Sequence, residues 1–236
     1  MANGASSQLT RAFAELSQTL FAGGDVDAVL ENLLGQACAT VRGCDYASIS
    51  LLGAGGRITT PVATDPLVVE LDEYQYEAGE GPCLEAVKEP AAAVYAADLA
   101  SDERFPVFGP RAAGRGVGSL LSHKIAADGT IGALNMYAIG ARAYSEADRE
   151  AAYLFAIFAA VVMAFAERRL QASQLREALE SRDVIGQAKG ILMEREKVTA
   201  DEAFEMLRRA SQRVNRKLRD LAQEMTETGE EPTALF

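Results

Sequence analysis

The sequence contains little of the chemistry that metal sites and most enzymes require. Its 236 residues include one histidine, His123, three cysteines and no tryptophan. Zinc sites are built from three or four His, Cys or carboxylate ligands at short spacings, and no such spacing surrounds His123. Gly-x-Ser-x-Gly, P-loop and His-Glu-x-x-His motifs are also missing. We therefore expect no metal, no cofactor and no enzymatic activity, and we interpret His123 as a residue of a core or a pocket wall.

The cysteines and the lack of long apolar runs indicate the cellular compartment of the protein. Cys38, Cys44 and Cys83 are odd in number and form no Cys-x-x-Cys pair, which is typical of reduced thiols in the cytoplasm. The N-terminus has no basic segment before an apolar stretch, as a signal peptide would have. The longest apolar run, residues 151–166, is shorter than the about 20 residues of a membrane helix. We expect a cytoplasmic protein with no membrane segment.

Charge is unevenly distributed along the chain. The formal net charge is −11, and residues 1–174 hold 12 bases against 21 acids, whereas residues 175–236 hold 11 against 13. Within the second part, residues 208–219 contain six bases and no acid. An acidic protein does not bind nucleic acid non-specifically over its whole surface. A local anion-binding surface at residues 208–219 is therefore favoured over a simple solvated helix face.

The first 140 residues alternate between helical and strand-like patterns. Residues 9–42 are predicted to form two helices separated at Gly23-Gly24-Asp25. Short alternating runs follow, and Asp128-Gly129 between two of them is a strong hairpin signal. The predicted strands are residues 46–52, 57–63, 91–95, 117–126 and 130–138, with loops and short helices at 66–76, 79–87 and 102–113. This order predicts an α/β (α+β) domain with an antiparallel sheet.

From Ser145 the sequence is helical almost to its end. Ser145 and Asp148 are spaced as a capping box, and so are Thr199 and Glu202. An apolar seam at coiled-coil spacing, interrupted by Arg168, comprises Phe158, Val161, Phe165, Ala172, Leu175 and Leu179. The seam favours a coiled-coil homodimer over a monomeric helix packed on the sheet. After a break at Asn215, a further helix leads to a polar tail that starts at Thr226.

The C-terminal part resembles the ANTAR domain, a small three-helix RNA-binding module of transcription antiterminators. The resemblance rests on Ser181-Arg-Asp-Val-Ile-Gly-Gln-Ala-Lys-Gly-Ile-Leu-Met193, Asp201-Glu-Ala-Phe204, Leu207-Arg208, Ser211 and Asn215-Arg-Lys-Leu-Arg-Asp-Leu-Ala222. It implies a dimer that binds two tandem RNA stem-loops with hexaloops and so prevents an overlapping terminator hairpin from forming.

This resemblance implies specific roles for residues of the module. Base-edge, backbone and phosphate contacts are expected from Arg182, Gln187, Lys189, Gly190, Arg208, Ser211, Arg213, Asn215, Arg216 and Lys217. Gly190 would permit a close approach of RNA or of a neighbouring helix. The apolar residues, Phe204 among them, are interpreted as core.

The preceding 150 or so residues resemble a GAF domain, a sensor fold with a six-stranded antiparallel sheet and flanking helices. Glu80-Gly-Pro-Cys83 is similar to a stretch of actinobacterial GAF–ANTAR proteins. The resemblance implies a small-molecule pocket, whose wall we expect to include Cys83, Asp98, Phe105 and His123. A Cys83 thiol at a helix N-terminus is a candidate redox or ligand contact, although simple packing is the favoured interpretation. The Asn-Lys-Phe-Asp-type motif of nucleotide-binding GAF domains is missing, and a domain that serves only for dimerisation stays an alternative.

These expectations divide the chain into parts. They are a GAF domain at 8–166, a helical coiled-coil linker at 167–180, an ANTAR domain at 175–230 and a tail at 231–236. A sensing or interaction module whose basic helix binds an acidic protein is the main alternative. DNA binding by a helix-turn-helix is less favoured, because the break at Asn215 has no glycine-containing turn.

Overall fold

The computed structural model describes residues 2–22, 24–88, 93–127 and 129–230. The chain divides into two compact units, Met1–Glu167 and Arg168–Phe236. Helix α6, Glu146–Glu196, begins in the first unit and ends in the second. The expected tail at 231–236 and Asp128 of the expected hairpin turn lie outside the described residues.

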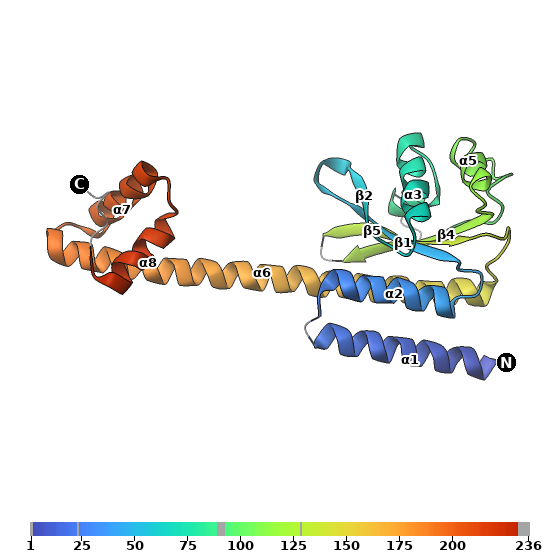
Figure 1. Ribbon diagram of the computed structural model, residues 1–236, viewed down its shortest axis with the longest axis horizontal. Helices are drawn as coiled ribbons and strands as arrows, with labels where there is room; N and C mark the ends of the chain where they lie inside the picture. The colour runs from blue at the N-terminus through green and yellow to red at the C-terminus, as the bar shows by residue number, and fades with distance from the viewer. Residues whose placement is uncertain (1, 23, 89–92, 128, 231–236) are drawn as a thin grey trace. The chain divides into compact units, whose positions relative to one another are not determined.

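The first unit is built on an antiparallel sheet with the strand order β2-β1-β5-β4-β3 (Figure 1). The strands are β1 Tyr46–Leu52, β2 Ile58–Ala63, β3 Ala93–Ala96, β4 Ser119–Ala127 and β5 Thr130–Ala138. The predicted α/β class is confirmed, but the described part of the chain forms five strands rather than six. Gly129 has a φ of 91°, and Ala127 pairs with Thr130 across the turn, as a two-residue hairpin requires.

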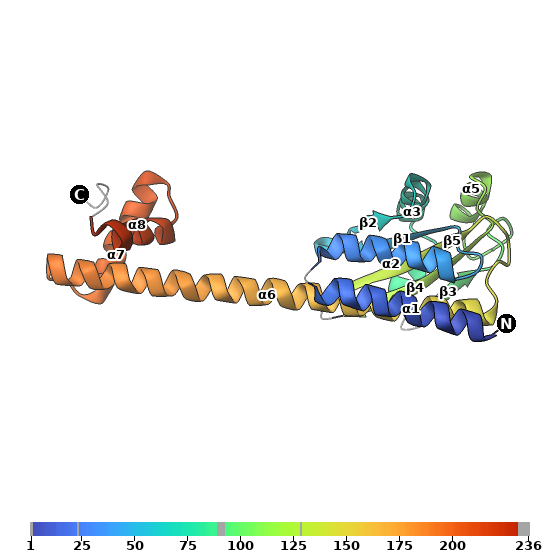
Figure 2. The same cartoon turned by 60° about the horizontal axis from the view of Figure 1, so that its bottom comes forward.

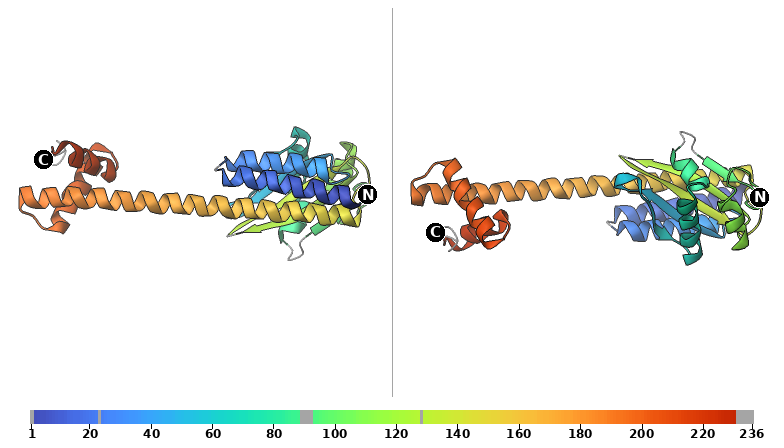
Figure 3. Two further views of the ribbon diagram at one scale, coloured as in Figure 1. Left: turned by 90° about the horizontal axis from the view of Figure 1, so that it is seen from below. Right: turned by 90° about the horizontal axis from the view of Figure 1, so that it is seen from above.

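Helices cover both faces of the sheet. They are α1 Ala2–Phe21, α2 Val26–Thr40, α3 Pro66–Ala78, α4 Pro82–Lys88 and α5 Phe108–Gly114, with a short 3-10 turn, η1, at Ala54–Gly56. Figures 1 and 2 show α1, α2 and the first part of α6 on one face and α3 and α5 on the other. Figure 3 shows α1, α2 and α6 side by side over the sheet.

Strand alternation decides which side chains meet each helical layer. Successive residues of a strand point to opposite faces. Leu121, Ile125, Leu134 and Met136 therefore join the core beneath α1, α2 and α6. Leu120 and Tyr137 instead join a second core with Phe105, Phe108 and residues of α3.

The expected coiled-coil seam of α6 is partly used inside the first unit. Phe158 packs on Phe13 of α1 with ring centroids 5.5 Å apart, and Phe165 packs on Phe21 at 6.3 Å. The remaining large seam residues, Val161, Leu175 and Leu179, are 51%, 63% and 54% exposed. These three seam residues therefore remain available to another helix.

One described helix, α6, is long and apolar enough to cross a membrane by length and composition, with an 18-residue window of mean hydropathy 1.7. A core helix of a globular domain has the same composition. Within this helix, Ala152, Phe155, Ala159 and Val162 are buried in the core of the first unit. Packing on the sheet therefore accounts for one side of this helix, whereas only 28% of the apolar window as a whole is buried.

The second unit comprises the end of α6, α7 Ala200–Val214 and α8 Leu218–Thr228. Its buried apolar residues include Ala188, Leu192, Ala203, Leu207, Ala210, Leu221, Ala222 and Met225. The capping box at Thr199 is confirmed, since its hydroxyl accepts from the Glu202 N–H and the Glu202 side chain accepts from the Thr199 N–H. Helix α8 continues to Thr228, so the expected start of the tail at Thr226 was too early.

Candidate functional site

A stripe of four side chains runs along one flank of α7. Phe204, Arg208, Ser211 and Asn215 follow one another at intervals of four, three and four residues, which places them on the same side of a helix. The neighbouring stripe, Ala203, Leu207 and Ala210, is buried in the core of the second unit. The flank therefore lies at the edge of the core and faces solvent.

Helix α6 adds basic residues to this flank. The Lys189 Nζ lies 5.9 Å from the centre of the Phe204 ring, within the range of a cation–π contact. Arg182 lies two turns before Lys189 and so is on the same side of α6. The structure thus brings Lys189 beside Phe204, which shares one side of α7 with Arg208. We call Arg182, Lys189, Phe204, Arg208 and Asn215 the basic flank.

Other predicted contact residues lie elsewhere. Gln187 is two positions from Lys189, and Arg213 is two positions from Ser211. A separation of two residues rotates a side chain by about 200° around a helix. Gln187 and Arg213 are exposed, but they do not belong to the basic flank. The predicted set therefore does not form one surface.

Acidic residues from outside the stretch 208–219 approach it in space. Arg208 pairs with Glu205 at 2.6 Å and Arg216 pairs with Glu224 at 2.8 Å. Arg219 pairs with Glu177 of α6 at 2.6 Å. The acid-free stretch is therefore less basic in the fold than in the sequence. These pairs are exposed, and an exposed ion pair is worth about 0–1 kcal/mol, so a nucleic-acid phosphate can displace the carboxylates at little cost.

Ser211 has a structural role that its position in the sequence does not reveal. Its hydroxyl donates to the Arg216 carbonyl at 2.5 Å, and the Arg216 N–H donates to the Ser211 carbonyl at 3.1 Å. Between them, Asn215 ends α7 with left-handed backbone angles of φ 51° and ψ 42°, a conformation that asparagine tolerates. The Ser211 hydroxyl is therefore engaged in the turn between α7 and α8 rather than presented to a ligand.

The structure gives the surroundings of two further residues of the second unit, Gly190 and Phe204. Gly190 was expected to allow a close approach, but a Cβ built on it meets no atom within 4 Å. No described residue of the chain therefore requires a glycine there. Phe204 was interpreted as core, yet 39% of it is exposed, because its position is one residue beyond the buried stripe. The sequence could have indicated this exposure, because Phe204 is four residues from Arg208 and therefore lies on the same side of the helix as this basic residue.

In the first unit, the four residues expected to line one pocket lie apart. Cys83 packs with Val87 and Ala133, and Phe105 lies in the other core on that side of the sheet. Asp98 pairs with Arg142 at 3.3 Å. His123 points to the opposite face, where its ring lies 5.7 Å from that of Tyr153. The expectation of a common wall was wrong, because strand alternation sends His123 toward α6.

Cys83 does not present a thiolate. Its side chain is fully buried at the start of α4, and this burial raises the pKa of the thiol to about 12. The interpretation of Cys83 as packing at a helix start, rather than as a redox or ligand contact, agrees with this position.

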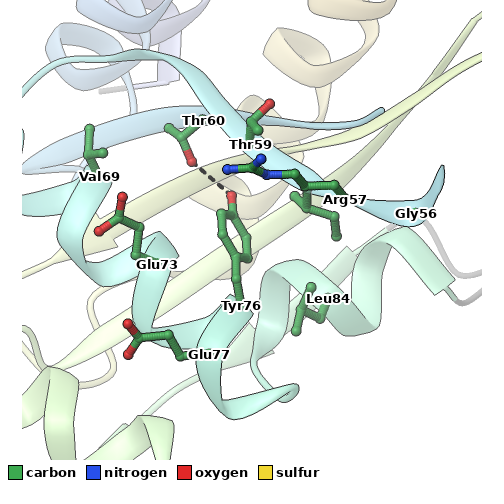
Figure 4. Close-up of a pocket in the computed structure, with 10 residues that line it drawn as sticks. Gly56, Arg57, Thr59, Thr60, Val69, Glu73, Tyr76, Glu77 and Leu84 are labelled. Carbon is green, nitrogen blue, oxygen red and sulfur yellow. Dashed lines mark hydrogen bonds between the residues drawn. The ribbon is translucent and has the colours of Figure 1, made fainter. Parts of the chain in front are cut away.

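The structure has a different pocket, between β2, α3 and α4. It has a volume of about 730 Å³ and is lined by Gly56, Arg57, Ile58, Thr59, Thr60, Val69, Glu73, Tyr76, Glu77 and Leu84. Figure 4 shows the Tyr76 ring pointing from α3 toward Thr60, with the Arg57 side chain alongside. The Tyr76 hydroxyl lies 2.8 Å from that of Thr60 and donates to Ser50 at 2.7 Å.

Behind this pocket lies a buried polar cluster centred on Asp72. The carboxylate accepts hydrogen bonds from Ser48 at 2.7 Å, Thr60 at 2.9 Å and Tyr137 at 2.5 Å. Asn135 donates to the same carboxylate at 3.1 Å. Burial nevertheless raises the pKa of Asp72 to about 6, since these hydrogen bonds only partly offset the loss of solvation. The signal for this cluster was the polar residue at every second position of β1, Ser48 and Ser50.

Within the described residues, no group of three His, Cys, Asp or Glu side chains is arranged to hold a metal ion. The features that remain for function are the basic flank and the pocket beside Tyr76.

Comparison with known proteins connects these features with two families. The chain matches the GAF domain family over residues 24–164 and the ANTAR domain family over residues 173–225. None of the curated proteins matches the chain.

Solved structures are similar in fold to the first part of the chain. One is the GAF domain from a phosphoenolpyruvate-protein phosphotransferase of Coxiella burnetii, with 15% identity, a TM-score of 0.54 and coverage of 69% of this chain and 96% of that chain. Another is free methionine-R-sulfoxide reductase from Neisseria meningitidis, with 15% identity, a TM-score of 0.55 and coverage of 70% and 91%. At these identities the likeness shows the fold alone.

Proposed function

Because the chain belongs to the GAF domain family and carries an ANTAR domain behind the GAF domain, we propose that it is a transcription antitermination regulator of the actinobacterial type. The ANTAR domain implies RNA binding and antitermination, and the GAF domain is the sensor part. As a homodimer, the protein holds two tandem hexaloop stem-loops in nascent RNA, and a terminator hairpin that overlaps them cannot form. No catalytic domain is identified, and we place the protein in the cytoplasm.

The basic flank is the observation that carries this proposal. Single-stranded loops expose base faces and edges, and a stem presents phosphates. Phe204 offers a partly exposed ring on which a base can stack, and Lys189 and Arg182 neutralise phosphates beside it. Asn215 supplies an amide for a base edge, and Arg208 becomes available when its exposed pair with Glu205 opens. Arg216 and Lys217, which follow Asn215, contact the backbone of the RNA beside this centre, and Gln187 and Arg213, on other sides of their helices, contact a different part of the RNA.

The homodimer is supported by apolar side chains along α6. Tyr153, Leu154, Ile157 and Val161 are each between 43% and 51% exposed, and Leu175, 14 residues after Val161, and Leu179, four residues later, lie on the same seam. Large apolar residues repeated along one helix are covered by another helix in a coiled coil. A second copy of α6 is the partner that provides the same pattern, and two RNA modules then face two stem-loops.

The domain boundaries that we propose follow from these parts. The sensor comprises residues 8–166, the helical linker 167–180, the RNA-binding domain 175–230 and the tail 231–236. The pocket of about 730 Å³ beside Tyr76 falls within the usual size range of small-molecule sites. A ligand there shifts α6 between two states and thereby changes the RNA affinity of the dimer.

Equilibrium binding of the full-length protein tests the proposal. The probe is an RNA with two tandem hexaloop stem-loops, with a loop-scrambled RNA of equal length as the control, each at two salt concentrations. We expect preference for the hexaloop RNA and weaker binding at the higher salt, because phosphate contacts release counterions. Equal affinity for both RNAs would contradict the proposal and favour an interaction module that binds an acidic protein.

A pair of variants localises the binding. Lys189→Ala should weaken binding and lower the salt slope by about one unit, the contribution of one phosphate contact. Lys197→Ala is the matched control, because Lys197 follows the end of α6, pairs with Glu194 and is not part of the basic flank. Equal effects of the two substitutions would remove Lys189 from the interface.

A further inference from the structure

Two cysteines that are six residues apart in the chain meet in the first unit. The Sγ atoms of Cys38 and Cys44 are 3.5 Å apart. Cys38 lies near the end of α2 and is partly exposed, whereas Cys44 lies just before β1 and is buried. The third cysteine, Cys83, belongs to a different cluster beneath α4.

The surroundings make one thiol the nucleophile and the other its partner. The hydrogen bond between the two sulfurs lowers the pKa of Cys38, although burial opposes this. The same contact, together with burial, raises the pKa of Cys44 well above its usual value. Cys38 is therefore the thiol that ionises, and it is also the one that solvent reaches. Thiolate character and exposure together favour oxidation.

The dithiol lies against the segment that leads into α6. Tyr144 directly precedes the capping residue Ser145, and its buried hydroxyl interacts electrostatically with both thiols. Gly43, next to Cys44, lies so close to Ala143 that a Cβ on Gly43 would come within 2.9 Å of the Ala143 Cβ. A movement of the loop that carries Cys44 therefore changes its packing against residues 143–144.

We propose that Cys38 and Cys44 are a peroxide-sensitive dithiol that closes to an intramolecular disulfide. The Cys38 thiolate attacks one oxygen of hydrogen peroxide, the O–O bond breaks, and Cys38 sulfenic acid and hydroxide are formed. The Cys44 sulfur then attacks the Cys38 sulfur and displaces the hydroxyl group, while the Cys44 thiol proton and the hydroxyl leave together as water. Two electrons pass from the two thiols to the peroxide, which ends as two molecules of water.

The geometry requires only a small movement. A disulfide needs an S–S distance of about 2.0 Å, so the sulfurs approach each other by about 1.5 Å from their present 3.5 Å. Cys38 lies two residues before the end of α2, in the last turn, where a helix unwinds most easily. The closed bond draws the Cys44 loop and the end of α2 together, and so changes the packing of Gly43 against Ala143 in the segment that precedes α6. The sensor domain thus receives a chemical input that is independent of its pocket.

Mass spectrometry of the full-length protein tests this proposal. Native protein is treated with hydrogen peroxide, alkylated after denaturation and digested. We expect a loss of 2 Da in a peptide pair linked through Cys38 and Cys44, while Cys83 remains alkylated as a free thiol. Sulfinic acid on Cys38 without the linked pair would overturn the proposal, and so would three unmodified thiols at a dose that oxidises glutathione.

Variants separate the two steps. In Cys44→Ser, the Cys38 sulfenic acid has no partner and should accumulate as a dimedone adduct. In Cys38→Ser, the buried Cys44 should remain unmodified under the same treatment. Cys83→Ser is the control and should form the disulfide as the wild type does. Hydrogen exchange at residues 143–150 should change on oxidation in the wild type and in Cys83→Ser, but not in either of the other variants.

Discussion

The first unit contains a cluster of buried polar side chains, whereas the polar side chains of the second unit are exposed. In the first, Ser48, Asp72 and Asn135 are fully buried and hydrogen-bonded to one another beneath α3. In the second, the polar side chains lie on exposed flanks, and the buried side chains among the described residues are apolar. A buried polar group depends on every one of its partners. The two units should therefore respond differently to pH and to substitution.

The largest expected difference is in pH dependence. The folded-state pKa of Asp72 is about 6, above its ordinary value of 3.8, so the native state holds this proton more tightly than the unfolded state. The free energy of unfolding of the first unit should therefore be greatest below pH 4 and fall as pH rises to about 6. The expected fall is about 3 kcal/mol, since one pKa unit corresponds to about 1.4 kcal/mol.

Tyrosine fluorescence measures this fall selectively, because all seven tyrosines precede residue 154 and there is no tryptophan. Urea unfolding between pH 4 and pH 7 should show the fall in the wild type and lose it in Asp72→Asn. Asp65→Asn is the control, since Asp65 caps α3 by accepting from the Leu67 N–H. If the free energies of unfolding of the wild type and of Asp72→Asn differed by the same amount at every pH, the raised pKa of Asp72 would be contradicted.

The next largest effect concerns the exposed ring of Phe204 in the second unit. Phe204→Ala should weaken hexaloop RNA binding by about 1–3 kcal/mol, the range for loss of one base–aromatic stack. The free energy of unfolding should also fall, because a side chain that is 39% exposed still buries most of its apolar surface, so binding is compared at a temperature where both proteins are folded. Phe204→Leu keeps the apolar bulk and should bind as poorly as Phe204→Ala, whereas Phe204→Tyr should bind almost normally. Normal binding by Phe204→Leu would exclude stacking.

A smaller effect concerns Gly190, where a Cβ meets open space. Gly190→Ala should stabilise the second unit by about 1 kcal/mol, the difference in helix propensity between the two residues. Hydrogen exchange at residues 185–195 measures this change. Weaker RNA binding by the more stable variant would mean that RNA or the second copy needs the glycine, and unchanged binding would place Gly190 outside the interface.

The smallest effect concerns the ion pairs on the basic flank. Glu205→Gln frees Arg208 and removes one negative charge, and should strengthen RNA binding by less than about 1 kcal/mol, as for other exposed pairs. Binding at low salt, where the effect is largest, provides the measurement. Glu194→Gln, which breaks the pair with Lys197 on another side of α6, should leave the affinity unchanged. A weaker affinity of Glu205→Gln would show that the carboxylate itself contributes to binding.

The sequence by itself determined the parts that depend on local order. Hydrophobic periodicity and turn signals predicted the helices, the strands and the hairpin at Gly129, and the capping box predicted the start of α7. The two families were recognisable from motifs, since their residues are local in the chain. Among the residues of the basic flank, Arg182, Lys189, Arg208 and Asn215 were expected from the resemblance to the ANTAR domain, and Arg208 also lies in the acid-free stretch.

Only the tertiary structure decided how residues that are distant in the chain meet. Strand alternation placed His123 and Ser122 on opposite faces, which dispersed the expected pocket wall. Folding brought Glu177 and Glu224 to the acid-free stretch, and it brought the Cys38 sulfur to that of Cys44. These contacts depend on distances through space, because electrostatic and hydrogen-bond energies fall with separation in space and not along the chain.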